Sequence, residues 1–474
     1  MSNTFSAWND TIVALATPPG IGAIGVIRLS GEKSIDIVDE LFPAKNLSQQ
    51  ASHTLHVGML KNENEELDEV VVALFKAPKS YTGENVVEIS CHGSPFIQQQ
   101  VIAACIQKGA RLAMPGEFTQ RAFLNAKMDL TQAEAVADVI AAHSSAAQQA
   151  ALKQLRGGFS SDLKLLRDEL IGFAALIELE LDFSQEDVEF ADRTKLQQLI
   201  TRLTQSTQDL INSFRLGNVI KNGVNVAIIG RPNAGKSTLL NALLNEERAI
   251  VSEIAGTTRD TIEETLNING IIFRFNDTAG IREHTTDTIE QIGIQKTFEK
   301  IDQSAILLYL ADLKNEDAET VFDTVLELSK NRITRPILVF NKADLIEGLT
   351  EFNHWIEMQK KFAEKVPVFL VSAKNAVKGL QTIDDLKQAL YNMVMDEKMI
   401  TENTIITNAR HYAALQKVAE CLSDIETGMQ NNLPGDLLAL DIRRCLHYLG
   451  EITGQVETDR DILGTIFGKF CVGK

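Results

Sequence analysis

Apolar and polar residues alternate over short runs in the first quarter of the chain, the pattern of strands with one buried face. Three such runs are AIGVIRLSG (23–31), DEVVVALFKAP (68–78) and NVVEISCHG (85–93), and turn-forming residues separate them. Strands mixed with shorter helical stretches are typical of α+β domains. The pattern therefore predicts a small α+β domain over residues 1–126.

From residue 127 the apolar positions recur at steps of three and four, the spacing of one helix face. The first stripe consists of Leu152, Leu155, Phe159, Leu163, Leu166, Leu170, Phe173 and Ile177. The pair Gly157-Gly158 interrupts this stripe and predicts a bend or a break. A second stripe predicts a helix over 194–215, and LGNVIKNG (216–223) reads as a loop.

Between residues 223 and 391 apolar strands alternate with helical runs, which is the pattern of an α/β domain. The strands are NVAIIG (225–230), IIFRFND (271–277), AILLYLA (305–311) and VPVFLV (366–371). Helical spacing resumes after 391. Because the helical stripes on both sides need apolar partners, we predict one helical domain, built from 127–222 and 392–474, into which the α/β domain is inserted.

A glycine-rich motif, GRPNAGKS (230–237), lies between the strand NVAIIG and the helical run STLLNALL (237–244). Backbone N–H groups of such a loop cradle phosphates, and the following helix offers its positive end. Lys236 is expected to reach the terminal phosphates, and the Ser237 hydroxyl to bind Mg²⁺. The predicted phosphate-binding residues are Asn233, Ala234, Gly235, Lys236, Ser237 and Thr238.

Two further motifs follow in order, GTTRD (256–260) and DTAG (277–280). Thr258 can close over Mg²⁺ when a γ-phosphate is bound, which makes 252–260 a predicted switch. Asp277 ends a strand and can hold the magnesium shell, and Gly280 can donate an N–H to the γ-phosphate. The predicted nucleotide contacts of these segments are Ser252, Glu253, Ile254, Ala255, Gly256, Thr257, Thr258, Asp277, Thr278, Ala279 and Gly280.

The fourth motif, NKAD (341–344), selects the base. Asp344 offers two acceptor oxygens to the two N–H donors of guanine, a donor pair that adenine lacks. The predicted base contacts are Asn341, Lys342, Ala343, Asp344, Ser372, Ala373 and Lys374. Any one motif alone can be an ordinary turn, but four in order, each at a predicted strand end, indicate a P-loop GTPase.

Ile281 stands where small signalling GTPases have the glutamine that orients the attacking water. Isoleucine cannot hold a water, so either hydrolysis is poor or another group performs this role. Glu290, a little downstream, is a candidate, although beside Glu283 and Asp287 it also reads as a solvated surface charge. Position alone does not decide between these two interpretations.

Composition limits the remaining possibilities. A chain of 474 residues favours three domains, and its net charge of −18 makes it a poor general binder of nucleic acid, so any RNA contact is local or shared with a partner. Five scattered cysteines without a CxxC pair indicate reduced thiols and argue against a zinc site. With neither a membrane-length apolar run nor a signal peptide, we expect a cytoplasmic protein without membrane contact.

Over its whole length the chain resembles the MnmE (TrmE) family of tRNA-modification GTPases. The resemblance rests on DTIVALATPPG near the start, MPGEFTQRAFLN (114–125), the four GTP motifs, IEQIGI and the tail FCVGK. It implies an N-terminal domain, a helical domain and an inserted GTPase domain. It also implies a homodimer formed through the N-terminal domain, with GTPase domains facing each other. It implies, finally, a heterotetramer with an FAD-dependent protein of the MnmG (GidA) type, which adds a carboxymethylaminomethyl-type group at carbon 5 of the wobble uridine of certain tRNAs.

The resemblance also assigns residues. It implies potassium-stimulated hydrolysis, with the ion held by Asn233, Ser252, Ile254 and Thr257, and it makes Glu290 the catalytic glutamate. It implies that 5-formyltetrahydrofolate or a related folate contacts Arg28, Glu88, Lys127 and Lys474. Without the resemblance, Arg28 and Lys127 read as surface charges and Glu88 as a solvated carboxylate.

Cys471 lies in the tail beside Lys469 and Lys474, where positive charge favours the thiolate. It is therefore a candidate nucleophile for the uridine chemistry, and a small packed residue is an equally good interpretation. Two other function classes stay open. A regulatory GTP switch of the ribosome-assembly type needs neither the N-terminal domain nor the tail, and a scaffold with a vestigial nucleotide site would not need the complete set of GTP groups.

Overall fold

The computed structural model describes residues 10–182, 193–244, 263–277, 301–395 except 331, 333, 376, 378 and 379, 405–455 except 432, and residues 466, 468, 470 and 473. The chain divides into two compact units. The first comprises residues 1–140, 152–204 and 417–474, and the second comprises 141–151 and 205–416. The division passes through two long helices, α7 (Arg193–Asn222) and α13 (Ala409–Gln430), so both contribute to each unit.

The first unit contains a six-stranded sheet, which confirms the predicted α+β domain. Its strands are β1 (Thr11–Leu15), β2 (Ile24–Ser30), β3 (Thr54–Asn62), β4 (Glu65–Phe75), β5 (Val86–His92) and β6 (Ala110–Leu112), in the order β3-β4-β5-β2-β1-β6. Only the β1–β6 pair is parallel. The three runs predicted as strands correspond to β2, β4 and β5.

The two faces of this sheet differ. One face buries Ile27, Leu29, Val87 and Ile89 against α1 (Ser34–Leu41) and α2 (Pro95–Gln107). The opposite face, which we call the open face, carries Arg28 and Glu88, which pair directly across β2 and β5. Leu55, Val57 and Ile24 are exposed on this same face, since the strand register aligns them with those residues.

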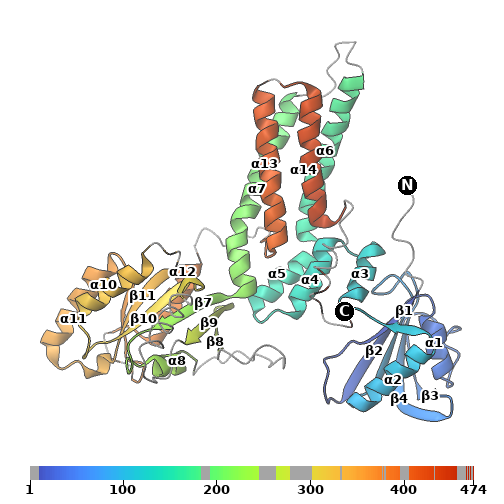
Figure 1. Ribbon diagram of the computed structural model, residues 1–474, viewed down its shortest axis with the longest axis horizontal. Coiled ribbons are helices and arrows are strands. Elements are labelled where there is room, and N and C mark those ends of the chain that lie inside the picture. The colour runs from blue at the N-terminus through green and yellow to red at the C-terminus, as the bar shows by residue number, and fades with distance from the viewer. Residues whose placement is uncertain are drawn as a thin grey trace, which may run out of the picture. The chain divides into compact units, whose positions relative to one another are not determined.

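Further helices belong to the first unit, except α5, most of which belongs to the second. They are α3 (Glu117–Leu124), α4 (Leu130–Ile140), α5 (Ser145–Leu155), α6 (Gly158–Asp182) and α14 (Gly435–Thr453). The break predicted at Gly157 is confirmed, because this residue has φ of +81° between α5 and α6. Figure 1 shows α13 and α14 beside α6 and α7, and Gln197 of α7 donates to Glu426 of α13. The helices before and after the insertion therefore pack on each other. None of the described helices is long and apolar enough to cross a membrane.

The loop predicted over 216–223 is wrong, because α7 continues to Asn222. Leu216 and Ile220 are buried at helical spacing. Gly217 is needed for a close contact and not for a turn, because a Cβ there would lie 1.8 Å from the Ile406 carbonyl oxygen. Gly223, with φ of +74°, follows the end of the helix, as glycine commonly does.

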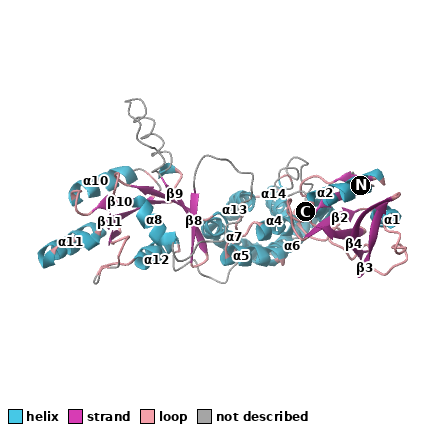
Figure 2. Ribbon diagram, turned by 90° about the horizontal axis from the view of Figure 1, so that it is seen from below, coloured by secondary structure: helices cyan, strands magenta, loops and turns pink. Residues whose placement is uncertain are grey.

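The second unit holds a six-stranded sheet in the order β12-β11-β10-β7-β9-β8. Figure 2 draws its strands in magenta. The strands are β7 (Val224–Ile229), β8 (Glu263–Ile268), β9 (Ile271–Asp277), β10 (Ile306–Asp312), β11 (Arg335–Asn341) and β12 (Val368–Leu370). All pairs are parallel except β8–β9. The carboxyl ends of five parallel strands therefore meet at one edge, where such sheets bind ligands.

Helices cover both faces of this sheet. One face packs on α8 (Lys236–Leu244) and α12 (Ile383–Val394), and the other on α10 (Ala318–Ser329) and α11 (Gly348–Ala363). The predicted domain boundary at 391 falls inside α12. Leu386 and Leu390 of this helix are buried in the same core as α8, so the whole of α12 belongs to the α/β domain.

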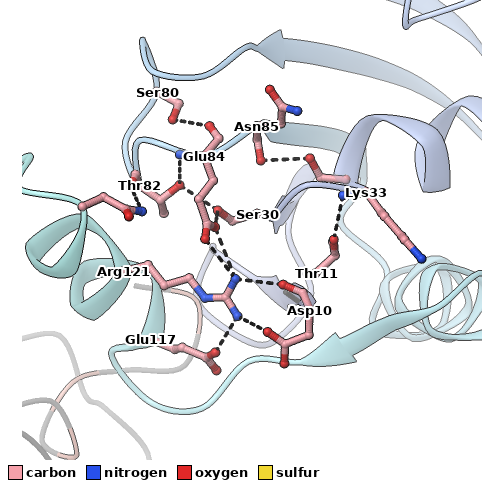
Figure 3. A network of polar contacts seen from close by, with 12 residues as sticks. Asp10, Thr11, Ser30, Lys33, Ser80, Thr82, Glu84, Asn85, Glu117 and Arg121 are labelled. Atoms are coloured by element: carbon pink, nitrogen blue, oxygen red, sulfur yellow. Dashed lines mark hydrogen bonds and ion pairs between the residues drawn. The ribbon is translucent and has the colours of Figure 1, made fainter. Parts of the chain in front are cut away.

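A buried ion-pair network fixes α3 to the first sheet (Figure 3). Arg121 is 2% exposed and pairs with Asp10 (2.7 Å), Glu117 (3.0 Å) and Glu84 (3.3 Å). Arg111 of β6 pairs with both Glu117 (2.7 Å) and Asp10 (2.7 Å). The network therefore joins the residue before β1, the middle of β6, the segment before β5 and α3.

Asp10 makes part of this network dependent on pH. Burial alone would raise the pKa of Asp10, but hydrogen bonds from Arg111 and Arg121 outweigh it and hold that pKa below its ordinary value. A lowered folded-state pKa means that Asp10 stabilises the fold above its unfolded pKa. That contribution is lost as pH falls through the folded pKa.

We predict that Glu117→Gln lowers the free energy of unfolding by about 3–5 kcal/mol, the usual cost of breaking a buried ion pair. The substitution removes one of the two carboxylates, Glu117 and Asp10, that Arg121 and Arg111 share. Glu66→Gln is the control, because Glu66 pairs with Lys61 at the surface, and it should cost about 0–1 kcal/mol. Urea unfolding of both variants measures the difference, and equal midpoints would contradict the prediction.

Candidate functional site

The glycine-rich loop lies at the ligand-binding edge of the second sheet, between β7 and α8. Gly230 passes so close to β10 that a Cβ would lie 2.1 Å from the Leu310 carbonyl oxygen. Gly235 has φ of +97°, and a Cβ there would lie 2.3 Å from the Asn341 amide nitrogen. Asn233 has φ of 63°. Both glycines are therefore required by backbone conformation or by close approach.

Lys236 begins α8 and turns back over this loop. Its Nζ donates to the carbonyl oxygens of Gly230 (2.6 Å) and Arg231 (3.0 Å). Ser237 and Thr238 are exposed in the first turn of the same helix. An ammonium group, a hydroxyl group and a helix N-terminus thus surround one loop, which suits a phosphate chain with its Mg²⁺ ion.

The Asn341 side chain joins the phosphate loop to the base loop. It is 2% exposed. Its Nδ2 donates to the Ala234 carbonyl (2.9 Å), and its Oδ1 accepts from the Ala373 N–H (2.9 Å). One amide therefore fixes the spacing between the segments predicted to bind the phosphates and the base.

Asp344 and Lys342 are positioned by separate contacts. The Ser372 hydroxyl donates to Asp344 Oδ1 (2.6 Å) and accepts from the N–H groups of Lys374 and Asn375, which ties Asp344 to the loop after β12. Lys342 adopts φ of 66° and its Nζ pairs with Asp312 Oδ2 at the end of β10 (2.7 Å). Burial would raise the pKa of Asp312, but the hydrogen bonds that its carboxylate accepts, the strongest of them from Lys342, together outweigh burial and lower that pKa.

Asp277 ends β9 beside Ile228 of β7, at the same sheet edge, and its side chain lies outside the described part. The remaining predicted switch residues lie outside the described residues altogether. They are Ser252, Glu253, Ile254, Ala255, Gly256, Thr257, Thr258, Thr278, Ala279, Gly280 and Glu290. Cys471 and Lys474 also lie outside them.

A second group of predicted residues gathers on the open face of the first sheet. Arg28 and Glu88 form an ion pair at 2.8 Å, and both side chains are partly exposed. The Arg28 guanidinium lies 5.4 Å from the ring centroid of Tyr81 and 5.7 Å from that of Phe118. Arg28 thus lies near two aromatic rings and an opposite charge, and is not an isolated surface charge.

The loop that carries Tyr81 also contacts Lys127, whose Nζ donates to the Pro78 carbonyl (3.0 Å). The Tyr81 hydroxyl bonds the Thr119 hydroxyl (2.8 Å), and burial raises the pKa of Tyr81. We call Arg28, Tyr81, Glu88, Phe118 and Lys127 the Arg28 cluster. Tyr81 and Phe118 were not predicted from the sequence, because a single aromatic residue in a turn or a short helix has no distinguishing spacing.

The C-terminal tail reaches the same sheet. Gly473 has φ of +97°, and a Cβ there would lie 2.2 Å from the Leu15 carbonyl oxygen of β1. Leu15 pairs with Ile27, next to Arg28. Phe470 is buried with Leu130 and Ala133.

A cavity of about 930 Å³ lies elsewhere in the first unit, between α6 and α7. Its lining includes Phe173, Leu176 and the ion-paired residues Glu169 and Arg202. Neither the GTP motifs nor the Arg28 cluster contributes to it, so we do not assign it to either site.

Comparison with known proteins identifies the family. A family model described as the MnmE helical domain matches residues 130–471, and one described as the GTP-binding protein TrmE N-terminus matches residues 11–127. The chain belongs to the MnmE family of tRNA modification GTPases. The Arg28 cluster lies within the TrmE N-terminal match.

Individual relatives agree along the whole chain. The tRNA modification GTPase MnmE of Cytophaga hutchinsonii is 52% identical over 474 residues, covering 100% of both chains. The MnmE of Christiangramia forsetii is 51% identical, covering 98% of this chain and 99% of that one. A solved structure of Era from Aquifex aeolicus, bound to GDP and aluminium fluoride, covers 42% of this chain and 66% of its own at 28% identity. Its TM-score of 0.26 is too low to establish a shared fold.

We predict that Asp344→Asn lowers GTP affinity by roughly a hundredfold, because two charge-assisted hydrogen bonds at about 1.5–3 kcal/mol each are weakened. The same variant should gain affinity for xanthosine triphosphate, whose base offers an acceptor to the new amide. Asp323→Asn, an exposed change on α10, is the matched control and should bind both nucleotides as the unmodified protein does. Unchanged GTP affinity in Asp344→Asn would remove the basis for this base assignment.

Proposed function

We propose that this chain hydrolyses GTP in order to drive modification of the wobble uridine of certain tRNAs. The observation that carries the proposal is the Asn341 bridge, which sets the phosphate loop and the base loop at a fixed separation. Ser237 and Thr258 would hold Mg²⁺, which neutralises charge on the phosphates when bound. Lys236 orients the terminal phosphates, and Asp344 selects guanine.

Hydrolysis requires groups other than a glutamine, because Ile281 replaces it. We assign the orientation of the attacking water to Glu290. A potassium ion held by Asn233, Ser252, Ile254 and Thr257 supplies positive charge at the phosphates when bound. The left-handed conformation of Asn233 supports this assignment, since it gives that residue a fixed place in the phosphate loop.

The Arg28 cluster is the proposed site of a one-carbon donor, 5-formyltetrahydrofolate or a related folate. A guanidinium beside two aromatic rings suits a flat heterocycle that also carries hydrogen-bonding groups. Glu88 can accept from N–H groups of such a ring, and Lys127 can contact its carboxylates. Gly473 at the Leu15 carbonyl supports the assignment of Lys474 and Cys471 to the same site.

The exposed surfaces of the first unit also bear on how the chain forms oligomers. We propose a homodimer through the N-terminal domain, and the exposed apolar side chains of Ile24, Leu55 and Val57 on the open face support this. We further propose a heterotetramer with an FAD-dependent protein of the MnmG (GidA) type. That partner supplies redox chemistry and shares the tRNA contact, as a chain with a net charge of −18 requires.

The test is nucleoside analysis of tRNA from cells that lack this protein. We expect loss of the carboxymethylaminomethyl-type group at carbon 5 of the wobble uridine, and its return when the intact gene is restored. Unchanged nucleosides together with a ribosome-assembly defect would favour the alternative function, a regulatory GTP switch without modification chemistry.

Potassium should accelerate GTP hydrolysis several-fold or more over sodium at equal ionic strength, because the ion replaces an arginine finger at the phosphates. Phosphate release in the two salts measures the effect. Asn233→Ala should reduce the difference between the salts, whereas Asn212→Ala, an exposed change on α7, should leave it intact. Equal rates in both salts would refute the ion assignment.

Glu290→Ala should lower the hydrolysis rate by roughly a hundredfold, as expected for loss of a positioned general base. GTP affinity should change little, because the contact is made mainly in the transition state. Single-turnover hydrolysis and nucleotide titration separate these effects, and Asp323→Asn, an exposed change on α10, is the control. A Glu290→Ala variant with the normal rate would move the assignment to Glu283.

Arg28→Gln should weaken binding of 5-formyltetrahydrofolate at least tenfold, because the guanidinium would lose its ion pair and its ring contacts. Isothermal titration on the full chain measures the affinity. Lys61→Gln, an exposed change on β3 of the same sheet, serves as the control and should bind normally. Equal affinity in Arg28→Gln would separate the Arg28 cluster from folate binding.

A further inference from the structure

A histidine and an aspartate are paired at the end of the sheet that carries the Arg28 cluster. His92 ends β5, and its Nδ1 lies 2.7 Å from Asp68 Oδ1. The other carboxylate oxygen, Oδ2, accepts the backbone N–H of His92 at 2.7 Å. The Asp68 side chain is 8% exposed, whereas that of His92 is 68% exposed.

The double contact fixes the orientation of the imidazole ring. A carboxylate at Nδ1 favours the tautomer that carries its proton there, so that Nε2 is left as an acceptor. The backbone contact prevents Asp68 from rotating away. A nearly buried carboxylate that orients an exposed imidazole is the arrangement by which a histidine becomes a general base.

A pair that only stabilises the surface has different geometry, as His447 and Glu451 illustrate. These residues lie one turn apart on α14, meet through a single 3.1 Å contact, and are both well exposed, at 53% and 33%. Such a pair contributes little. In the Asp68–His92 pair one partner is nearly buried and makes two contacts, which implies that the ring position itself matters.

His92 shares the open face with Glu88. The strand register places His92 opposite Ile24 and Glu88 opposite Arg28, with Ser90 and Val26 between them. Four strand residues span about 13 Å. The imidazole and the Arg28 cluster therefore lie at two ends of one continuous strip of sheet.

The chain around His92 is fixed as well. Gly93 donates to the Ala23 carbonyl (3.1 Å) and accepts from the Gly22 N–H (3.0 Å). A Cβ on Gly93 would lie 2.3 Å from the Gly22 carbonyl oxygen. Residues 90–94 (SCHGS) and the loop that follows residues 16–20 (ATPPG) are thus held together beside the imidazole. The proposed GTP chemistry uses neither segment.

We propose that His92, oriented by Asp68, is a catalytic residue that moves a proton during one-carbon transfer at the N-terminal domain. This rests on the proposed folate function. As carbon 5 of the wobble uridine forms its bond to the one-carbon unit, His92 Nε2 takes the proton that carbon 5 loses. His92 then gives that proton to the folate nitrogen whose bond to the carbon breaks, so no oxidant or reductant is needed. Asp68 is a positioning residue.

The first test uses the full ligand-free chain labelled with ¹⁵N-histidine, with the His92 signals assigned from their loss in His92→Gln. The imidazole should show the Nδ1-protonated tautomer, and Asp68→Asn should change that pattern. Addition of 5-formyltetrahydrofolate should shift the His92 signals and leave those of His447 unmoved. A His92 signal that shows no response to saturating folate would overturn the proposal.

The second test compares variants in tRNA modification with the partner protein present. His92→Gln should slow modification by roughly a hundredfold at saturating folate, with folate affinity and GTP hydrolysis changed less than twofold. The modification rate of Asp68→Asn should lie between those of His92→Gln and the unmodified chain. His447→Gln should modify tRNA at the rate of the unmodified chain. Absence of folate binding in the unmodified chain would instead overturn the proposed function, whereas normal folate binding with a full-rate His92→Gln would overturn only this inference.

Discussion

The nucleotide site depends on one buried side-chain amide. Asn341 bonds a carbonyl of the phosphate loop on one side and an N–H of the base loop on the other. A buried amide left half-paired is costly, so both loops are held at the separation that this side chain sets. Asp344 and Lys236 gain their relative positions from this link.

In the first sheet, a network of ion pairs imposes an equivalent constraint. Arg121 pairs with carboxylates from three separate segments, and Arg111 shares two of them, Asp10 and Glu117, which holds α3 against the sheet. Phe118 and Thr119 lie on that helix, so their contacts with Arg28 and Tyr81 follow from the same network. A buried ion pair adds little net stability. Its contribution here is to specify one arrangement of the Arg28 cluster.

Local patterns predicted much of this molecule and failed where contacts join distant segments. The strand runs and the four motifs depend on periodicity and spacing, so both sheets and the Lys236, Asn341 and Asp344 positions were predictable. Tyr81 and Phe118 meet Arg28 from distant parts of the chain, which no local pattern reports. The loop predicted over 216–223 was wrong because Gly217 allows α7 to approach the Ile406 carbonyl closely, and the sequence alone does not distinguish a glycine needed for close approach from one needed for a turn.

Gly217 also bears on how such a protein arises. Its contact with the Ile406 carbonyl places the points where the chain enters and leaves the α/β domain side by side. A segment whose ends already touch can be spliced into a helix-to-helix connection without parting the helices around it. The GTPase domain is therefore a portable module, and a domain with equally close ends, grafted between residues 217 and 406, would meet no topological barrier.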